Sequence, residues 1–238
     1  MNQIIGSAAV LALLIVGGGL LGLADRRNFS WRWLLAAAGL LLINDALLTR
    51  CYGLLPVLLS GASWNWQGKG LALVATLIVA SLPGFGWRRV GLTLAQNQEG
   101  RWPTYGVALA LCLVLAGIAL AMPTDPLDGE TLAFQLTMPG LEEEPYYRGT
   151  LLFALNEAFR GRVRALGADW GWGGLLSCVL FGLAHGFGYG QSGFSFDPMI
   201  FALTGGTVLI VVWIRERTGS LVLPIVLHNF GNTIGLLI

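Results

Sequence analysis

Long apolar runs separated by short polar connections set the pattern of this chain. The runs are rich in Leu, Ala, Val, Ile and Gly, and charged residues gather between them. An α-helix of about 20 apolar residues crosses the hydrocarbon core of a bilayer, so each run predicts a membrane-crossing helix. The predicted helices are residues 4–24, 33–48, 70–86, 104–122, 131–159, 170–189, 198–214 and 219–238. We therefore expect an all-α, polytopic bundle of about eight transmembrane helices, forming a single domain over residues 1–238.

The composition supports a membrane protein. Hydrophobic residues make up 55% of the 238 positions, charged residues make up 11%, and the mean hydropathy is +0.69. These values are too apolar for a soluble domain of this length. The net charge of +1 and the lack of any basic run argue against a nucleic-acid partner. Cys51, Cys112 and Cys178 have no paired spacing, and we expect them to be small buried residues.

The basic residues predict the orientation of the chain. Eleven arginines fall in the connections after the first, third, fifth and seventh predicted helices, namely residues 26, 27, 32, 88, 89, 101, 160, 162, 164, 215 and 217. The positive-inside rule assigns those connections to the cytoplasm. This predicts an integral protein of the plasma (inner) membrane, with the N-terminus and the C-terminus outside. The other basic residues are Arg148, in the fifth predicted helix, and Arg50 and Lys69, in a predicted loop at residues 49–69.

A charged cluster interrupts the fifth apolar run. Three consecutive glutamates, Glu142, Glu143 and Glu144, are followed by Arg148. Ionisable groups at membrane depth are costly and indicate a functional site. Glu144 and Arg148 are four positions apart and can pair on one helix face, whereas Glu143 points about 100° away and is left free for chemistry. The alternative is that the acids only cap a helix N-terminus, which explains neither their number nor the arginine.

Proline and glycine beside these charges predict a break in the helix. Pro139-Gly140 precede the glutamates and Pro145 follows them, and proline removes a helical hydrogen bond. We therefore expect a helix to restart near Leu141, with carboxylates in its first turn. Another intramembrane acid, Asp45, lies in the second predicted helix and needs a polar partner, either through a structural hydrogen bond to a neighbouring helix or through a role in the site.

Both histidines of the chain lie in predicted membrane helices. His185 is in the sixth, and His228 shares a face of the eighth with Asn232, four positions later. Each could be a buried, hydrogen-bonded residue without a chemical role. Alternatively, Glu143 and one imidazole can deprotonate a water molecule, while the other imidazole and an amide stabilise an oxyanion. Two imidazoles and a carboxylate could instead hold a divalent ion such as Zn²⁺. Both alternatives predict amide hydrolysis in an intramembrane cavity.

Three motifs occur in order along the second half of the chain. They are Glu143-Glu144 followed after three residues by Arg148, Phe181 followed after three residues by His185, and His228 followed after three residues by Asn232. The set resembles the CAAX protease and bacteriocin-processing family of intramembrane proteases, which includes type II CAAX prenyl endopeptidases. The resemblance covers about residues 139–234, which would be the protease core, with residues 1–130 as accessory helices. The chain departs from the family pattern at Glu142 and Pro145.

The resemblance implies a role for each motif residue. The implied roles are water activation for Glu143 and His185, the oxyanion hole for His228 and Asn232, and a supporting ion pair for Glu144 and Arg148. The family is described both as metal-dependent and as glutamate-dependent, so the resemblance leaves a zinc ion open.

Two classes of function follow from these observations. The first is an intramembrane endopeptidase that cuts a peptide or lipidated protein at the lipid bilayer, either a CAAX-type prenylated protein or a bacteriocin-like peptide. The second is a non-catalytic membrane protein, such as an immunity factor or a small proton-coupled transporter with Glu143 and Asp45 on one water path. The sequence shows no inverted repeat, which weakens the transporter interpretation.

Overall fold

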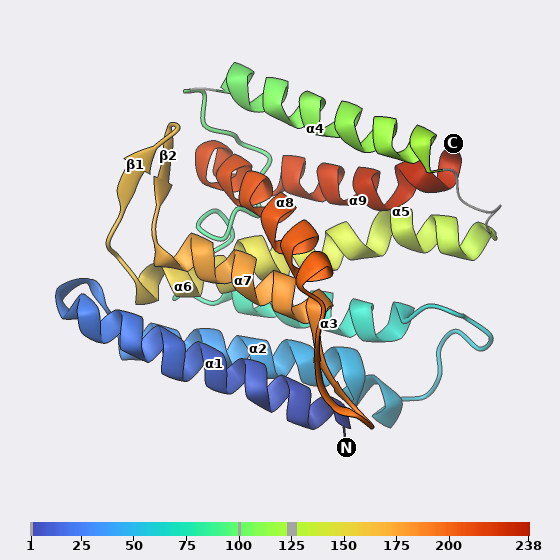
Figure 1. Ribbon diagram of the computed structural model, residues 1–238, viewed down its shortest axis with the longest axis horizontal. Helices are drawn as coiled ribbons and strands as arrows, with labels where there is room; N and C mark the ends of the chain where they lie inside the picture. The colour runs from blue at the N-terminus through green and yellow to red at the C-terminus, as the bar shows by residue number, and fades with distance from the viewer. Residues whose placement is uncertain (1, 100, 123–127) are drawn as a thin grey trace. The chain divides into compact units, whose positions relative to one another are not determined.

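A computed structural model describes residues 2–99, 101–122 and 128–238 of the chain. Residues 123–127, in the predicted connection between the fourth and fifth helices, lie outside the described residues. The chain forms two compact units, one of residues 1–45 and 151–213 and the other of residues 46–150 and 214–238. The positions of the two units relative to one another are not determined (Figure 1).

The first unit contains both short hairpins and the N-terminal helices. Its elements are α1 (Asn2–Ala24), η1 (Arg26–Asn28), most of α2 (Trp31–Thr49), α6 (Leu152–Ala158), β1 (Val163–Ala165), β2 (Ala168–Trp170), α7 (Trp172–Gly186), β3 (Phe187–Gly190), β4 (Gly193–Phe196) and most of α8 (Pro198–Thr218). Helix α6 packs on α7, and β3 packs on α1. A Cβ at Gly18 would lie 3.0 Å from Leu34 Cδ1, so the glycine allows α1 to approach α2. Asp45, on α2, accepts a hydrogen bond of 2.8 Å from Ser7 Oγ on α1, and this is the polar partner that the sequence required.

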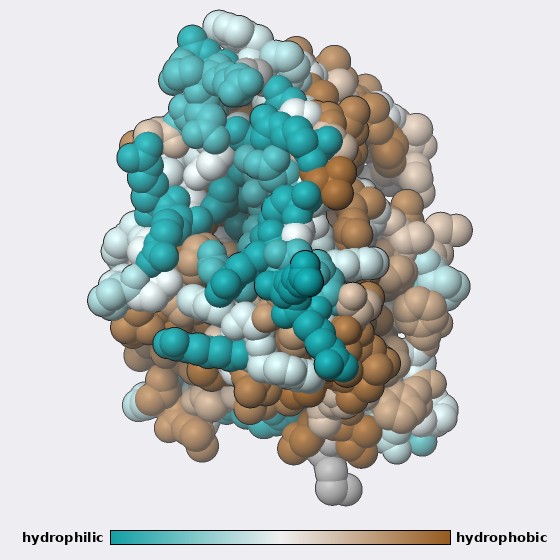
Figure 2. All heavy atoms as spheres, turned by 90° about the vertical axis from the view of Figure 1, so that its left-hand side faces the viewer, coloured by the Kyte–Doolittle hydropathy of each residue, from teal (hydrophilic) through white to brown (hydrophobic). Residues whose placement is uncertain are grey.

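Two antiparallel hairpins correct the all-α prediction. The sixth predicted helix was expected to reach Tyr189, but α7 ends at Gly186 and the chain continues as β3, paired with β4 from Phe187↔Phe196 to Gly190↔Gly193. Aromatic and small residues alternate along both strands, and a period of two fits a strand rather than a helix. The other hairpin, β1–β2, carries an exposed ion pair of 3.1 Å between Arg164 and Asp169. Hydrophilic side chains gather on the face viewed in Figure 2, the side on which Figure 1 shows this hairpin.

The second unit is a layer of helices packed around α5. Its elements are η2 (Cys51–Leu54), α3 (Trp66–Ser81), α4 (Arg101–Ala121), α5 (Gly129–Glu143), most of η3 (Glu144–Leu151) and α9 (Val222–Leu237). Helix α9 packs on both α4 and α5, and α5 also packs on α3, as the neighbouring ribbons in Figure 1 show. A Cβ at Gly140 would lie 2.8 Å from the carbonyl oxygen of Ile225, so this glycine lets the backbones of α5 and α9 meet closely.

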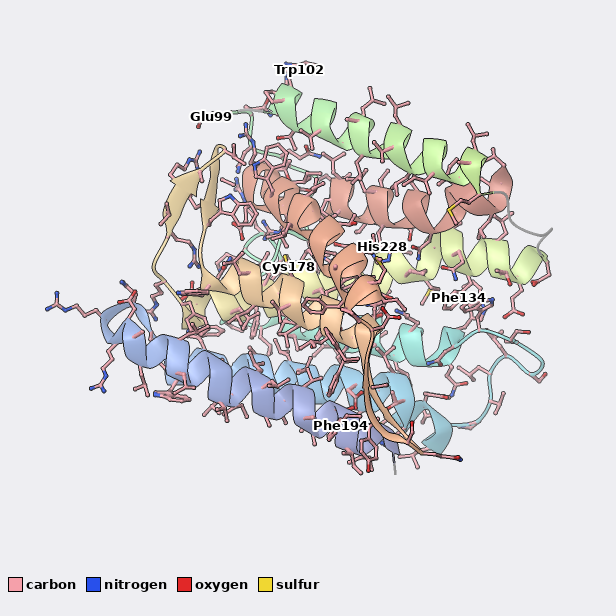
Figure 3. The ribbon with its side chains drawn as sticks, viewed as in Figure 1. Glu99, Trp102, Phe134, Cys178, Phe194 and His228 are labelled. Carbon is pink, nitrogen blue, oxygen red and sulfur yellow. The ribbon has the colours of Figure 1, made fainter. Side chains whose placement is uncertain are left out.

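Aromatic and polar contacts join the start of α3 to α5. The Phe134 ring of α5, labelled in Figure 3, has two aromatic neighbours. It stacks on Trp64 at 4.8 Å between centroids and meets Trp66 edge-on at 5.0 Å. Glu130, in the first turn of α5, accepts hydrogen bonds from the backbone N–H groups of Ser63 and Trp64. These N–H groups hold the pKa of the half-buried Glu130 carboxyl below its usual value, because they stabilise the charged form. The contacts fix the first turn of α3, which carries Lys69.

The expected helix break near Leu141 is wrong. The backbone is helical from Gly129 to Ala158, through α5, the π-helical segment η3 and α6. Pro139 lies inside α5, and Pro145 lies inside η3. A π-helical turn bonds to the residue five positions back instead of four, so a local π segment can take up an irregularity such as a proline without ending the helix. Such segments are common at functional sites.

Four of the described helices are long and apolar enough to cross a membrane, namely residues Ile4–Ala24 of α1, α2, α4 and α8. Helices α7 and α9 are apolar but shorter. Large apolar side chains on the long helices are exposed, including Leu20 at 64% and Leu113 at 65%, as expected for contact with lipid tails. The chain is therefore a mainly helical integral membrane protein, and the number of eight crossings stays a prediction.

Candidate active site

The three glutamates lie where α5 passes into η3, deep in the second unit. The side chains of Glu142 and Glu144 are 0% and 1% exposed, and the Glu143 side chain is 15% exposed. Carboxylates at such depth are stable only when opposite charges or hydrogen-bond donors compensate them. Lys69, Arg148 and His228 supply this compensation, and together with the three glutamates they form what we call the ionic cluster.

Lys69, in the first turn of α3, bridges two of the glutamates. Its Nζ atom lies 2.6 Å from Glu142 Oε2 and 2.5 Å from Glu143 Oε1. The prediction that Lys69 belongs to a loop is therefore wrong, because α3 begins at Trp66 with Asn65 as its N-cap. The expectation that Glu143 is left free is also wrong, since the lysine holds one of its oxygens.

His228, on α9 and labelled in Figure 3, contacts the third glutamate, Glu144, and also reaches Glu143. Its Nδ1 atom lies 2.6 Å from Glu144 Oε1, and its Nε2 atom lies 3.7 Å from Glu143 Oε2. An ionised carboxylate can only accept a hydrogen bond, so Nδ1 carries a hydrogen and donates it to Glu144. This contact sets the orientation of the ring and directs Nε2 toward Glu143.

Arg148 holds the far side of Glu144. Its Nε atom lies 3.3 Å from Glu144 Oε2, in the ion pair that the four-residue spacing predicts, and both side chains are 1% exposed. The guanidinium carbon also lies 5.7 Å from the centroid of the Tyr147 ring, within the range of a cation–π contact. Glu144 is thus held between Arg148 and His228, and it cannot turn without breaking one of the two contacts.

The charges of the ionic cluster leave room for one proton. Three ionised glutamates face one lysine and one arginine, which gives a net charge of −1 when His228 is neutral. A buried group of charges is most stable near neutrality, so a positive charge on His228 would complete the charge balance of the cluster. The arrangement is therefore suited to stabilising a positive charge on His228.

Asn232 contacts a different part of α5. Its Nδ2 atom donates a hydrogen bond of 3.1 Å to Gln135 Oε1, and the side chain is exposed. Asn229, beside His228, accepts a hydrogen bond of 2.7 Å from the backbone N–H of Gly140. This contact was not predicted from the sequence, although Gly140 allows a close approach of another helix and is a signal for it. The role of Asn232 in an oxyanion hole stays a prediction.

His185 lies in the first unit, so its placement beside Glu143 also stays a prediction. It is exposed near the end of α7, its Nδ1 atom is 2.9 Å from the carbonyl oxygen of Phe181, and the two rings are 4.5 Å apart. A carbonyl oxygen only accepts, so Nδ1 carries the hydrogen and Nε2 is the basic nitrogen of the neutral ring.

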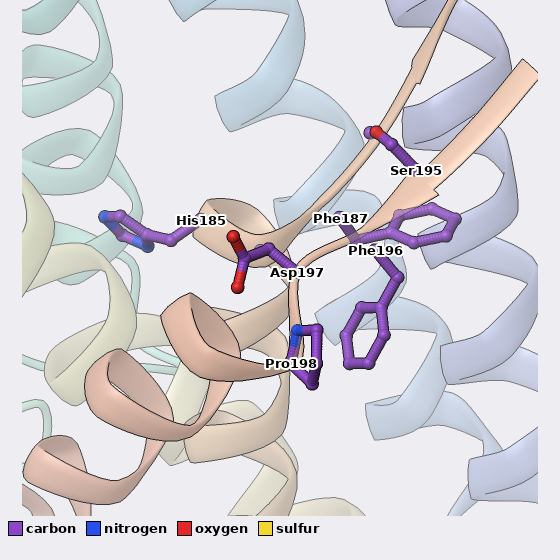
Figure 4. Close-up of a pocket in the computed structure, with 8 residues that line it drawn as sticks. His185, Phe187, Ser195, Phe196, Asp197 and Pro198 are labelled. Atoms are coloured by element: carbon purple, nitrogen blue, oxygen red, sulfur yellow. The ribbon is translucent and has the colours of Figure 1, made fainter. Parts of the chain in front are cut away.

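A cavity of about 480 Å³ opens beside this histidine (Figure 4). We call it the His185 pocket, and its side chains are those of His185, Phe187, Ser195, Phe196, Asp197 and Pro198. Asp197 Oδ1 accepts the backbone N–H groups of Met199 and Ile200 at 2.9 Å each and so caps α8. The pocket therefore combines one imidazole with a hairpin of aromatic and small residues.

Two atoms of the ionic cluster that could bind a zinc ion already have other partners. Within the described part of the chain, no group of three or more His, Cys, Asp or Glu side chains is arranged to hold a metal ion. Lys69 places an ammonium group on Glu143 Oε1, where a second cation would be repelled, and Glu144 holds Nδ1 of His228. No step of the mechanism proposed below uses a metal, and a chelator tests the point.

A comparison with protein families matches residues 129–234 to a model described as Rce1-like, type II CAAX prenyl endopeptidase Rce1-like. The matched segment begins at the start of α5, ends within α9, and includes Glu143, His185, His228 and Asn232. No curated protein and no solved structure matches the chain. The match agrees with the resemblance seen in the three sequence motifs, and it covers just under half of the chain.

Proposed function

We propose that this chain, whose residues 129–234 carry the CAAX endopeptidase family match, is an intramembrane endopeptidase that hydrolyses a peptide bond of a membrane-associated substrate. One observation carries the proposal. Glu143, in the matched segment, is held by Lys69 on one oxygen and faces His228 Nε2 at 3.7 Å with the other, inside the buried ionic cluster. A positioned carboxylate of this kind can act as a general base.

The proposed reaction begins with a water molecule beside Glu143. Glu143, assisted by His185, takes a proton from the water, and the water oxygen attacks the carbonyl carbon of the scissile peptide bond. His228, as an imidazolium whose Nδ1–H is held by Glu144, donates from Nε2 to the oxyanion, and the Asn232 amide donates beside it. When the tetrahedral intermediate collapses, the C–N bond breaks and the departing amine takes the proton from Glu143.

The charges of the cluster support these roles. Protonation of His228 brings the cluster from −1 to neutral, so Glu144 stabilises the imidazolium that the oxyanion needs. Arg148 fixes Glu144 from the other side. If Arg148 did not hold Glu144, the carboxylate could turn away, and His228 would lose the acceptor that orients its ring.

We propose a substrate that carries a lipid and a cleavable peptide, and the family description favours a CAAX-type prenylated protein over a bacteriocin-like peptide. Exposed apolar side chains on the long helices place the chain in a bilayer, where such a substrate also resides. Eight crossings, both termini outside and a plasma-membrane location belong to the same proposal, on the charge distribution given above. No observation favours the transporter or immunity alternative, because the Ser7 hydrogen bond gives Asp45 a structural role.

Purified protein in nanodiscs tests the function with three substrates: a farnesylated CAAX peptide, the same peptide without the lipid, and a bacteriocin-like leader peptide. We expect cleavage of the farnesylated peptide and its loss in Glu143→Gln, with activity unchanged by a chelator. Loss of activity with the chelator and its return with zinc would instead establish metal dependence. Equal cleavage by wild type and Glu143→Gln would refute the mechanism.

A further inference from the structure

Lys69 belongs to the ionic cluster, but neither the sequence motifs nor the family match includes it. It lies outside residues 129–234, and it is the only lysine in a sequence with 14 basic residues. Its side chain is 14% exposed, and its Nζ atom contacts Glu142 and Glu143 at 2.6 and 2.5 Å. A single ammonium group thus contacts both Glu142 and Glu143, the candidate general base.

The choice of a lysine fits this double contact. Two neighbouring buried carboxylates repel each other, and one of them would take up a proton if no cation lay between them. An ammonium group is a compact charge with three donors, so it can bond two carboxylates in different directions, whereas the planar fork of an arginine suits one carboxylate at a time. Glu142, at 0% exposure, and Lys69 balance each other's charge, which offsets the cost of burying both.

Two helices that pack against α5, namely α3 and α9, each bring a charged or titratable group to Glu143. Lys69 comes from α3 and His228 comes from α9, while Glu142 and Glu144 flank Glu143 along its own helix and Arg148 follows in η3. Arg148 is directed to Glu144, and His228 donates to Glu144. Lys69 therefore brings a cation into direct contact with Glu143 Oε1, while Oε2 faces His228.

We propose that Lys69, anchored by Glu142, is a positioning residue that keeps Glu143 ionised and holds it with Oε2 directed to the reacting water. The proposal deepens the proposed function and rests on it, because it concerns the general base of that reaction. Lys69 itself does not touch the substrate. Its effect is on the pH range over which Glu143 can accept a proton and on the orientation of the carboxylate.

Four variants test whether Lys69 acts directly on the charge and orientation of Glu143 or only neutralises Glu142. Lys69→Met removes the cation, so the acid limb of the kcat/KM profile should move to higher pH by about 1 to 3 pH units, the usual effect of an opposite charge in contact with a carboxylate. Glu142→Gln leaves Lys69 to Glu143 alone, and the limb should move to lower pH. Lys69→Arg keeps the charge and should leave the limb near that of wild type while lowering kcat. The double variant Lys69→Met/Glu142→Gln keeps the net charge of the cluster, and its limb should lie between those of wild type and Lys69→Met.

The double variant gives the sharpest outcome. If Lys69 only neutralises Glu142, removing both residues restores the wild-type pH profile, and this result would overturn the proposal. An unchanged acid limb in Lys69→Met would also overturn it. A limb that stays displaced in the double variant supports a direct action of Lys69 on Glu143. Since the double variant removes one charge of each sign, it also serves if Lys69→Met alone fails to fold.

A readout that does not depend on cleavage keeps this test separate from that of the proposed function. Because the chain has one lysine, labelling with [¹⁵N]lysine gives one side-chain Nζ signal in an NMR spectrum. We expect this signal to titrate with Glu143 in wild type and to shift in Glu143→Gln. An identical signal in wild type and Glu143→Gln would show that the contact is absent. If the contact is seen but wild-type protein cleaves none of the peptides, the proposed function fails while the assignment of Lys69 to Glu143 is supported.

Discussion

The ionic cluster and the His185 pocket are built in opposite ways. In the cluster, charged groups from α3, α5, η3 and α9 hold one another at distances between 2.5 and 3.7 Å, and several of them are almost fully buried. In the pocket, His185 is exposed, and a backbone carbonyl and the ring of Phe181 hold it. Folding therefore fixes the cluster, and changes there should affect both stability and chemistry. Changes in the pocket should affect chemistry while the fold tolerates them.

The largest expected effect is that of Glu143→Gln on cleavage. The amide keeps the shape of the side chain but cannot take a proton from water, so we expect kcat/KM to fall by about 10³-fold, within the range of general-base loss. The matched control is Glu157→Gln, in an exposed pair with Arg160 at 3.8 Å in the other unit. Cleavage rates of the two variants in nanodiscs are the measurement. A similar fall in both would mean that loss of any carboxylate disturbs the protein and that Glu143 has no special role.

Arg148→Met tests whether the cluster supports the fold. The substitution leaves Glu144 buried without its arginine, and breaking a buried ion pair from one side costs about 3 to 5 kcal/mol. Arg164→Met removes one partner of the Arg164–Asp169 pair, whose side chains are 59% and 56% exposed, and should cost about 1 kcal/mol or less. Unfolding in detergent by increasing denaturant gives both free energies. Equal losses for the two variants would remove the distinction between the buried and the exposed pair.

His185→Ala should lower catalytic activity while leaving the stability of the fold almost unchanged. If His185 assists Glu143, kcat/KM should fall by about 10²-fold, the lower end of an acid–base contribution. The free energy of unfolding should change little, because the side chain is exposed and the bond to Phe181 stays within one helix. The same cleavage and denaturant experiments measure both quantities. Full activity in this variant would remove the His185 pocket from the reaction and leave the ionic cluster to act alone.

Much of the fold follows from local sequence signals. Apolar runs of membrane-spanning length predict α1, α2, α4 and α8, whose bounds differ from the predicted ones by a few residues. The hairpin of β3 and β4 carries a period of two that could have been recognised, but its apolar character resembles the end of a helix. The π-helical segment was missed because proline was expected to end the helix, whereas a changed hydrogen-bond register accommodates it.

The site was predictable only where its contacts are local. The pair of Glu144 and Arg148 follows from a spacing of four residues within one helix. The contact of Lys69 with Glu143 joins residues 74 positions apart on different helices, and no pattern in a single sequence encodes such a pairing. Asn232 shows both sides of this limit. The four-residue spacing predicted its face of α9 correctly, but its contact with Gln135 on α5 depends on how the two helices pack.

The smallest expected effect concerns the hairpin that lines the His185 pocket. Gly193 has a φ of +96°, which L side chains rarely adopt, and no atom lies within 4 Å of an added Cβ. Gly193→Ala should therefore cost about 1 kcal/mol through backbone strain alone. Gly190, at the other end of the turn, has an ordinary φ and equally open space, so Gly190→Ala should cost less or stabilise slightly. If neither variant changes cleavage, the pocket needs His185 but not a rigid turn. If Gly193→Ala lowers kcat/KM well beyond its effect on stability, the hairpin positions the substrate, and the pocket depends on a fixed geometry as the ionic cluster does.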